Sequence, residues 1–270
     1  MQAKRPVCIG SFRIVLLLLF WLLPHGATAH PEDEFCMPGE SGLDPALCEQ
    51  LAALDSADGK TARLVTPILD DSGNARGALS TFMLYVSIGV NHILPGGLDH
   101  ILFVLALVLA RTKLKPLVVQ VSAFTLAHTV TLGLAATGVL SPPASVVEPL
   151  IAASIAFVAI ENLFVKDAPR WRPLIVFLFG LLHGLGFAGF FGELGLPSGQ
   201  FWSALFGFNV GVELGQFAVI AVAMAILMAG RRWAGSQVVA EEYRTWVVLP
   251  GSAAIGAIGL WWAIERSLLA

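Results

Sequence analysis

Long apolar blocks, separated by short polar loops, make up the C-terminal two thirds of the chain. A helix that crosses the hydrocarbon core of a bilayer takes about 20 such residues, and most of the blocks approach or reach that length. The pattern predicts an all-α, polytopic membrane helix bundle with about six transmembrane helices. Their expected ranges are residues 98–111, 116–139, 145–165, 173–192, 201–229 and 245–264.

Basic residues mark alternate loops between these blocks. The loops "SPPASVVE" and "GELGLPSGQ" contain neither Lys nor Arg. The three remaining loops between the blocks are basic, and basic loops stay in the cytoplasm. With these three loops in the cytoplasm, six spans leave both ends of the bundle outside. The residues that carry this argument are Arg111, Lys113 and Lys115 in the first loop, Lys166, Arg170 and Arg172 in the second, and Arg231 and Arg232 in the third.

The apolar stretch "LSTFMLYVSIGVNHIL", residues 79–94, cannot be a full span without moving every basic loop to the wrong side. We therefore expect an interfacial or re-entrant helix on the outer side. The span after it, Leu98 to Arg111, has 14 residues and would be about 21 Å long at 1.5 Å per residue. That is short of the roughly 30 Å core. A broken helix before a short span predicts irregular backbone buried in protein or lining a polar cavity.

The N-terminal region resembles a secretory leader. Lys4 and Arg5 precede the apolar run "IVLLLLFWLL", and "ATA" supplies the small residues of a cleavage site. The expected domains are a signal peptide at 1–29, an exported polar segment at 30–78 and a membrane domain at 79–270. Cys36 and Cys48 would remain after cleavage, and an oxidising compartment favours a disulfide bond between them.

Composition narrows the class of protein. Hydrophobic residues make up 56% of the 270 positions and charged residues only 13%, which is about half the charged fraction of a soluble domain. The net charge of −3 excludes the basic surface that nucleic acid requires. The chain is expected to be a multi-pass protein of a bacterial inner membrane, with a periplasmic N-terminus and the lipid bilayer as its surroundings.

Four of the six histidines lie in or beside the apolar blocks, and so do the acidic residues Asp99 and Glu213. Ionisable groups are costly there and point to function. Imidazoles combined with one or two carboxylates bind zinc, nickel, cobalt, copper or ferrous iron. The sequence therefore predicts a site near the outer face for a divalent transition metal, with zinc, nickel and cobalt as candidates. The candidate ligands are His92, Asp99, His100, His128, His183 and Glu213.

The candidate ligands are not equivalent. Asp99 and His100 are adjacent, so on a helix their side chains diverge by about 100°. His100 is the expected ligand, and Asp99 either binds the metal or orients a neighbour. His128 has a structural alternative, which is a hydrogen bond to a nearby Ser or Thr.

Small residues recur every four positions in the fourth and fifth blocks, an arrangement that lets helices approach closely. Close packing here is expected to seat His183 against a face that carries Asn209 and Glu213. The halves of the blocks nearest the basic loops are poor in polar groups. Glu161 there either belongs to an ion path or pairs with Lys166 or Arg170.

Five motifs, in this order, resemble the HupE/UreJ family of membrane proteins, in particular the branch with an exported N-terminal extension: "GVNHILPGGLDHILFVLALVL", "FTLAHTVTLGLA", "EPLIAASIAFVAIEN", "FGLLHGLGFAG" and "FNVGVELGQ". The resemblance covers about residues 79–265. It implies a role in hydrogenase or urease accessory functions and a nickel or cobalt permease. By the same resemblance, His92, Asp99 and His100 match the family's His-Asp-His metal motif, and His183 matches its later His-Gly motif.

Three functions remain open on the sequence. In a metal permease, the outer cluster receives the cation, and Glu161 and Asn162 are candidates for passing it inward. In a membrane-embedded zinc-dependent hydrolase, Glu213 would be the general base. In a non-catalytic protein, the exported segment would dock periplasmic or accessory partners. A continuous polar path to the cytoplasm favours the permease, and a blind outward site with tightly held metal favours the hydrolase.

Overall fold

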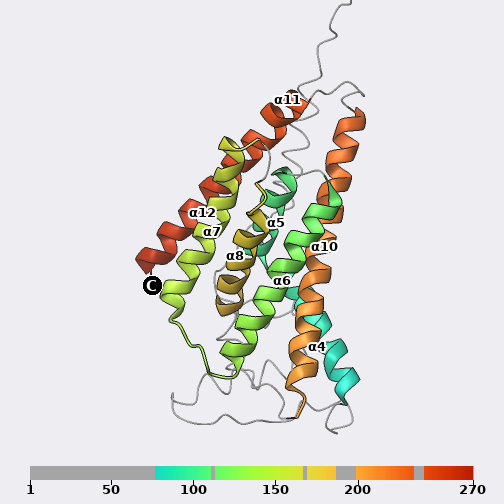
Figure 1. Ribbon diagram of the computed structural model, residues 1–270, viewed down its shortest axis with the longest axis vertical. Helices are drawn as coiled ribbons and strands as arrows, with labels where there is room; N and C mark the ends of the chain where they lie inside the picture. Colours follow the sequence, from blue (N-terminus) through green and yellow to red (C-terminus); the bar gives the residue numbers. More distant parts are fainter. Residues whose placement is uncertain (1–76, 111–112, 167–168, 187–198, 234–239, 270) are drawn as a thin grey trace, which may run out of the picture.

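A computed structural model describes residues 77–110, 113–166, 169–186, 199–233 and 240–269. Every regular element in these ranges is helical, as the sequence predicts (Figure 1). The elements are α4 (Ala78–Ile93), α5 (Leu98–Ala110), α6 (Leu114–Ala136), α7 (Ala144–Phe164), α8 (Arg172–Gly186), α10 (Phe201–Trp233), α11 (Ala240–Tyr243), the π-helix η1 (Arg244–Val248) and α12 (Leu249–Leu269).

The long helices run side by side along the long axis of the molecule (Figure 1). One end of the bundle, where α6 begins and α7 and α10 end, carries the basic loops; we call it the basic end, and the opposite end the far end. Helix α4 begins at the far end, and the C-terminus also lies there (Figure 1). The predicted arrangement, with both ends of the membrane domain on one side, is therefore the arrangement of the described helices.

Four described helical stretches are long and apolar enough to cross a membrane: 114–136, 144–164, 201–230 and 241–268. Helices α4 and α5 pass the same test only together, and they meet at a bend of 70°. The structure thus confirms a polytopic helical bundle. It also places α4 along α10, so that α4 belongs to the bundle as half of a broken span or as a re-entrant segment.

Apolar side chains cover the outside of the bundle. Val119, Leu126 and Val130 on α6 are about half exposed or more, and they share one side of the helix. Exposed tryptophans occur toward both ends, with Trp171 near the basic end and Trp202 at the far end. Tryptophan is enriched at the two interfaces of a bilayer, so this surface is that of a membrane-embedded protein.

Glycines allow two pairs of helices to touch backbone to backbone. On α10, a Cβ atom at Gly207 would overlap the carbonyl oxygen of Phe82, and one at Gly211 would overlap that of Val86, both on α4. On α8, Gly184 faces the carbonyl oxygen of His128 on α6 in the same way. The expectation that the glycines seat α8 against α10 is therefore wrong: α10 packs on α4, and α8 packs on α6.

A buried polar group joins four helices near the basic end. Arg172 forms an ion pair with Glu161, with 3.3 Å between Nε and Oε2, and both side chains are more than nine-tenths buried. Arg172 also donates to Oδ1 of Asn162 at 2.8 Å, and Asn162 donates in turn to the carbonyl oxygen of Ala106 and to Ser252. Glu161 therefore pairs with neither Lys166 nor Arg170. Arg172 belongs to one of the loops that the sequence places in the cytoplasm, and its guanidinium turns inward to this carboxylate.

Three predictions for the N-terminal region, namely the signal peptide, the exported segment up to residue 76 and the Cys36–Cys48 disulfide, lie outside the described residues.

Candidate metal centre

The break between α4 and α5 turns the chain so that two histidines face each other. A Cβ atom at Gly97 would overlap the carbonyl oxygen of His92, so only glycine lets the chain pass this close. Helix α5 then starts at once, and Ile101 donates its backbone N–H to the carbonyl oxygen of Gly97 at 2.9 Å. The ring centroids of His92, in the last turn of α4, and His100, in the first turn of α5, are 4.9 Å apart.

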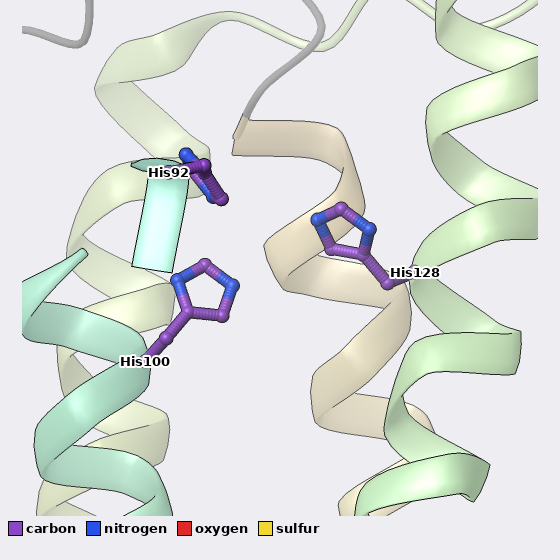
Figure 2. A group of neighbouring side chains, drawn as sticks. All are labelled: His92, His100 and His128. Atoms are coloured by element: carbon purple, nitrogen blue, oxygen red, sulfur yellow. The ribbon is translucent and has the colours of Figure 1, made fainter. Parts of the chain in front are cut away.

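His128 of α6 joins these two residues. One ring nitrogen from each of His92, His100 and His128 lies within 4.8 Å of the others, and we call this group the three-histidine cluster. Figure 2 shows the three imidazoles converging on a common space from different helices. Three nitrogens bound to one ion at 2.0–2.1 Å are about 3.3–3.6 Å from one another in tetrahedral or trigonal geometry. Movements of about 1 Å or less by each ring would therefore let all three bind one cation.

A hydrogen bond fixes which nitrogen of His128 faces the cluster. Asn209 on α10 donates its Nδ2 to the carbonyl oxygen of Leu205 at 2.8 Å, so its Oδ1 is an acceptor for Nδ1 of His128 at 3.0 Å. His128 must then carry its proton on Nδ1, which leaves a lone pair on Nε2. Among the described residues, Nε2 of His128 has no hydrogen-bond partner. This is the arrangement in which a neighbouring amide orients a metal ligand.

Replacement of Asn209 by Leu is expected to weaken metal binding by about 10- to 100-fold, the usual effect of losing a partner that orients a histidine ligand. The carboxylate of Asn209→Asp still accepts from Nδ1, so binding should recover. Titration of purified protein with Ni²⁺ measures both. The adjacent variant Val210→Ala, on a side chain that is 40% exposed, is the control. Wild-type affinity in Asn209→Leu would show that His128 does not bind the metal.

His183 on α8 lies beside the cluster. Its ring centroid is 4.9 Å from that of His100, and the residue is only 2% exposed. Ser154 donates its hydroxyl to the carbonyl oxygen of Ile151 and lies 3.1 Å from Nε2 of His183. His183 therefore donates from Nε2, and Nδ1, which has no hydrogen-bond partner among the described residues, keeps a lone pair. His183 is therefore the nearest further imidazole with a free lone pair beside His100, but it is outside the three-histidine cluster.

Asp99 points to another partner. Its two carboxylate oxygens accept from Nη1 and Nη2 of Arg266 at 2.8 and 3.1 Å, a bidentate ion pair between α5 and α12. Arg266 also lies 5.3 Å from the ring centre of Trp262. The structure therefore does not bring Asp99 into the cluster, although it is the residue before His100. Arg266 is the partner that sequence reasoning missed; its only signal is a lone arginine near the end of the last apolar block.

Glu213 is also outside the cluster. Its Oε1 accepts from the hydroxyl of Ser122 on α6 at 2.6 Å. No carboxylate belongs to the three-histidine cluster in the described part of the chain. A general base for activating a metal-bound water is thus not supplied by the residue that the sequence suggested.

Phenylalanine rings close the side of the cluster that faces the basic end. On each of α5, α6 and α8, a phenylalanine lies three or four residues nearer that end than the histidine of the same helix. These pairs are His100 with Phe103, His128 with Phe124 and His183 with Phe179. The phenylalanines contact one another: Phe103 lies 5.2 Å from Phe124 and 6.1 Å from Phe179 between ring centroids. Phe103 and Phe124 are 1% exposed. A cation cannot pass straight between α5, α6 and α8 without displacing these rings.

Comparison with known proteins gives one match. Residues 71–266 match the family model described as HupE / UreJ protein. No curated protein and no solved structure matches the chain. The matched range contains every described helix up to the last turn of α12, together with the four buried histidines of these helices. The chain belongs to the HupE/UreJ family.

Proposed function

We propose that the protein is a permease for a divalent transition-metal ion of the nickel and cobalt type, and that the three-histidine cluster is the site where the ion binds during transport. The HupE/UreJ family is associated with nickel and cobalt transport or handling. The single observation that supports the proposal most strongly is the convergence of three buried imidazoles from separate membrane helices. Imidazole suits nickel, cobalt and zinc.

The side chains around the cluster favour transport over catalysis. In the described part of the chain the cluster contains no carboxylate, and the nearest acidic residue in sequence, Asp99, is paired with Arg266. The zinc-dependent hydrolase would need a base beside the metal, and Glu213 instead accepts a hydrogen bond from Ser122.

The proposal includes an orientation. With the basic end in the cytoplasm, the far end faces the periplasm of a bacterial inner membrane, and so does the N-terminal segment. His128 is 8 residues from Ala136 and 14 from Leu114, or about 12 Å from the far end of α6 and about 21 Å from the basic end. The ion would enter from the periplasm. A signal peptide and a Cys36–Cys48 disulfide remain part of this proposal.

Metal retention separates the two candidate functions. A permease should be purified without stoichiometric metal, bind about one Ni²⁺ or Co²⁺ per chain in titration, and lose it to a chelator within minutes. The hydrolase should retain zinc through purification. Elemental analysis before and after treatment with EDTA makes the distinction, and one zinc per chain that survives the chelator would contradict the permease.

A further inference from the structure

A polar seam runs between α6 and α10, starting at the three-histidine cluster. Three side-chain hydrogen bonds cross it: His128 with Asn209, Thr125 with Gln216 at 3.1 Å, and Ser122 with Glu213 at 2.6 Å. The residues recur on one face of each helix, at positions 122, 125 and 128 of α6 and 209, 213 and 216 of α10. The seam is therefore a continuous feature of this interface.

The seam leads from the cluster toward the basic end. Helix α10 runs in that direction, so Glu213 and Gln216 lie about 6 and 10 Å beyond Asn209. Helix α6 runs the opposite way, and Thr125 and Ser122 lie about 4.5 and 9 Å before His128. The phenylalanine layer closes the direct route between α5, α6 and α8. The seam bypasses that layer.

Two side chains in the seam, Glu213 and Gln216, lack interaction partners among the described residues: Glu213 lacks a counter-charge and the amide nitrogen of Gln216 lacks an acceptor. Glu213 is a half-buried carboxylate in the middle of a membrane helix, and no cationic side chain is within ion-pair distance of it in the described part of the chain. Gln216 is 1% exposed, and its Nε2 has no hydrogen-bond partner among the described residues. An ionised group inside a membrane needs a counter-charge, and a buried amide nitrogen needs an acceptor such as water. A hydrated cation would supply the first, and its water the second.

The ligand chemistry changes along the seam. The cluster offers imidazole nitrogens, which bind nickel and cobalt well, whereas Glu213 and its neighbours offer carboxylate, hydroxyl and amide oxygens. A nickel or cobalt ion that moves from nitrogen to oxygen ligands is held less tightly and can be released. We infer that Glu213, positioned by Ser122, is a second cation-binding station, which receives the ion from the three-histidine cluster and passes it toward the basic end. This inference rests on the proposed permease function.

The variant Glu213→Gln tests the station without disturbing the packing, because Gln has nearly the same shape and its oxygen still accepts from Ser122. The full chain is reconstituted in liposomes that contain a Ni²⁺-sensitive dye, and Ni²⁺ binding is titrated in detergent. Uptake by Glu213→Gln should fall about 10-fold or more, and Ni²⁺ affinity should stay within about twofold of wild type. Glu213→Asp, which keeps the charge, should recover part of the uptake.

The matched control is Glu241→Gln, the same substitution at a carboxylate that is 69% exposed at the basic end; its uptake should equal that of wild type. Should Glu213→Gln be unstable, Ser122→Ala removes the positioning hydroxyl and should also lower uptake at unchanged binding. Wild-type uptake in both variants, with none in His100→Ala, would overturn this inference and leave the permease intact. Absence of Ni²⁺ uptake by the wild-type protein would remove the permease and the inference with it.

Discussion

Replacement of His100 by Ala should abolish measurable metal binding. His100 is the central imidazole of the site: its ring centroid lies 4.9 Å from those of His92 and His183 and 5.9 Å from that of His128. Loss of a partner that only orients a ligand costs about 10- to 100-fold in affinity, so loss of the ligand itself should cost about 100-fold or more. Titration of the purified variant with Ni²⁺ measures the change.

A second variant at the same position separates ligation from packing. His100→Leu fills most of the space of the imidazole but offers no nitrogen. Both variants should lose metal, and the leucine variant should unfold at nearly the wild-type temperature. If His100→Leu binds Ni²⁺ as wild type does, the cluster is not the binding site.

Enlargement of Gly211 should damage both the fold and the site. A methyl group at this position would overlap the carbonyl oxygen of Val86 on α4, so Gly211→Ala must push α4 away from α10. Overpacking of this kind costs about 1–3 kcal/mol, which corresponds to a melting temperature lower by about 2–12 °C in a chain of this size. Since His92 is in the last turn of α4, Ni²⁺ affinity should fall too. Thermal unfolding in detergent and Ni²⁺ titration measure the two effects.

Gly256→Ala on α12 is the matched control, because its new methyl group would lie at ordinary contact distances of 3.5 and 3.6 Å from Ile160 and Ala159. Its melting temperature and Ni²⁺ affinity should be unchanged. Equal melting temperatures for Gly211→Ala and the control would show that α4 and α10 are not packed as closely as the structure has them.

Much of the fold could be predicted from local signals in the sequence. Apolar blocks and basic loops were sufficient to predict a multi-pass helical bundle, because hydrocarbon leaves a helix few alternatives. The Pro-Gly-Gly break between His92 and His100 predicted an interruption beside polar groups. The structure shows why glycine is needed there, as the backbone at Gly97 touches the carbonyl oxygen of His92.

The pairing of helices could not be predicted in the same way. A stripe of glycines shows that some backbone approaches closely, but it does not say which one. The stripe on α10 therefore suggested α8 as its partner, whereas the structure has α4 there. This pairing of helices determines the geometry of the site, because it lets Asn209 orient His128 and places His183 beside Ser154.

Charge partners distant in sequence were equally hidden. Asp99 and Arg266 are 167 residues apart, and nothing in either local motif points to the other. Because Asp99 binds Arg266, it does not join the histidines of the cluster, although the sequence predicted it as a candidate metal ligand next to His100. The polar seam was missed for a related reason: Ser122, Thr125 and Gln216 are ordinary residues in membrane helices until two helices bring them together.

Uptake of metal by the reconstituted protein tests the central claim most directly. Liposomes that contain the wild-type chain and an enclosed Ni²⁺-sensitive dye should take up Ni²⁺ at a rate that saturates with its concentration. Liposomes with His92, His100 and His128 all replaced by Ala should take up no more than empty vesicles. Equal uptake by the wild-type and triple-variant proteins would contradict transport through the three-histidine cluster.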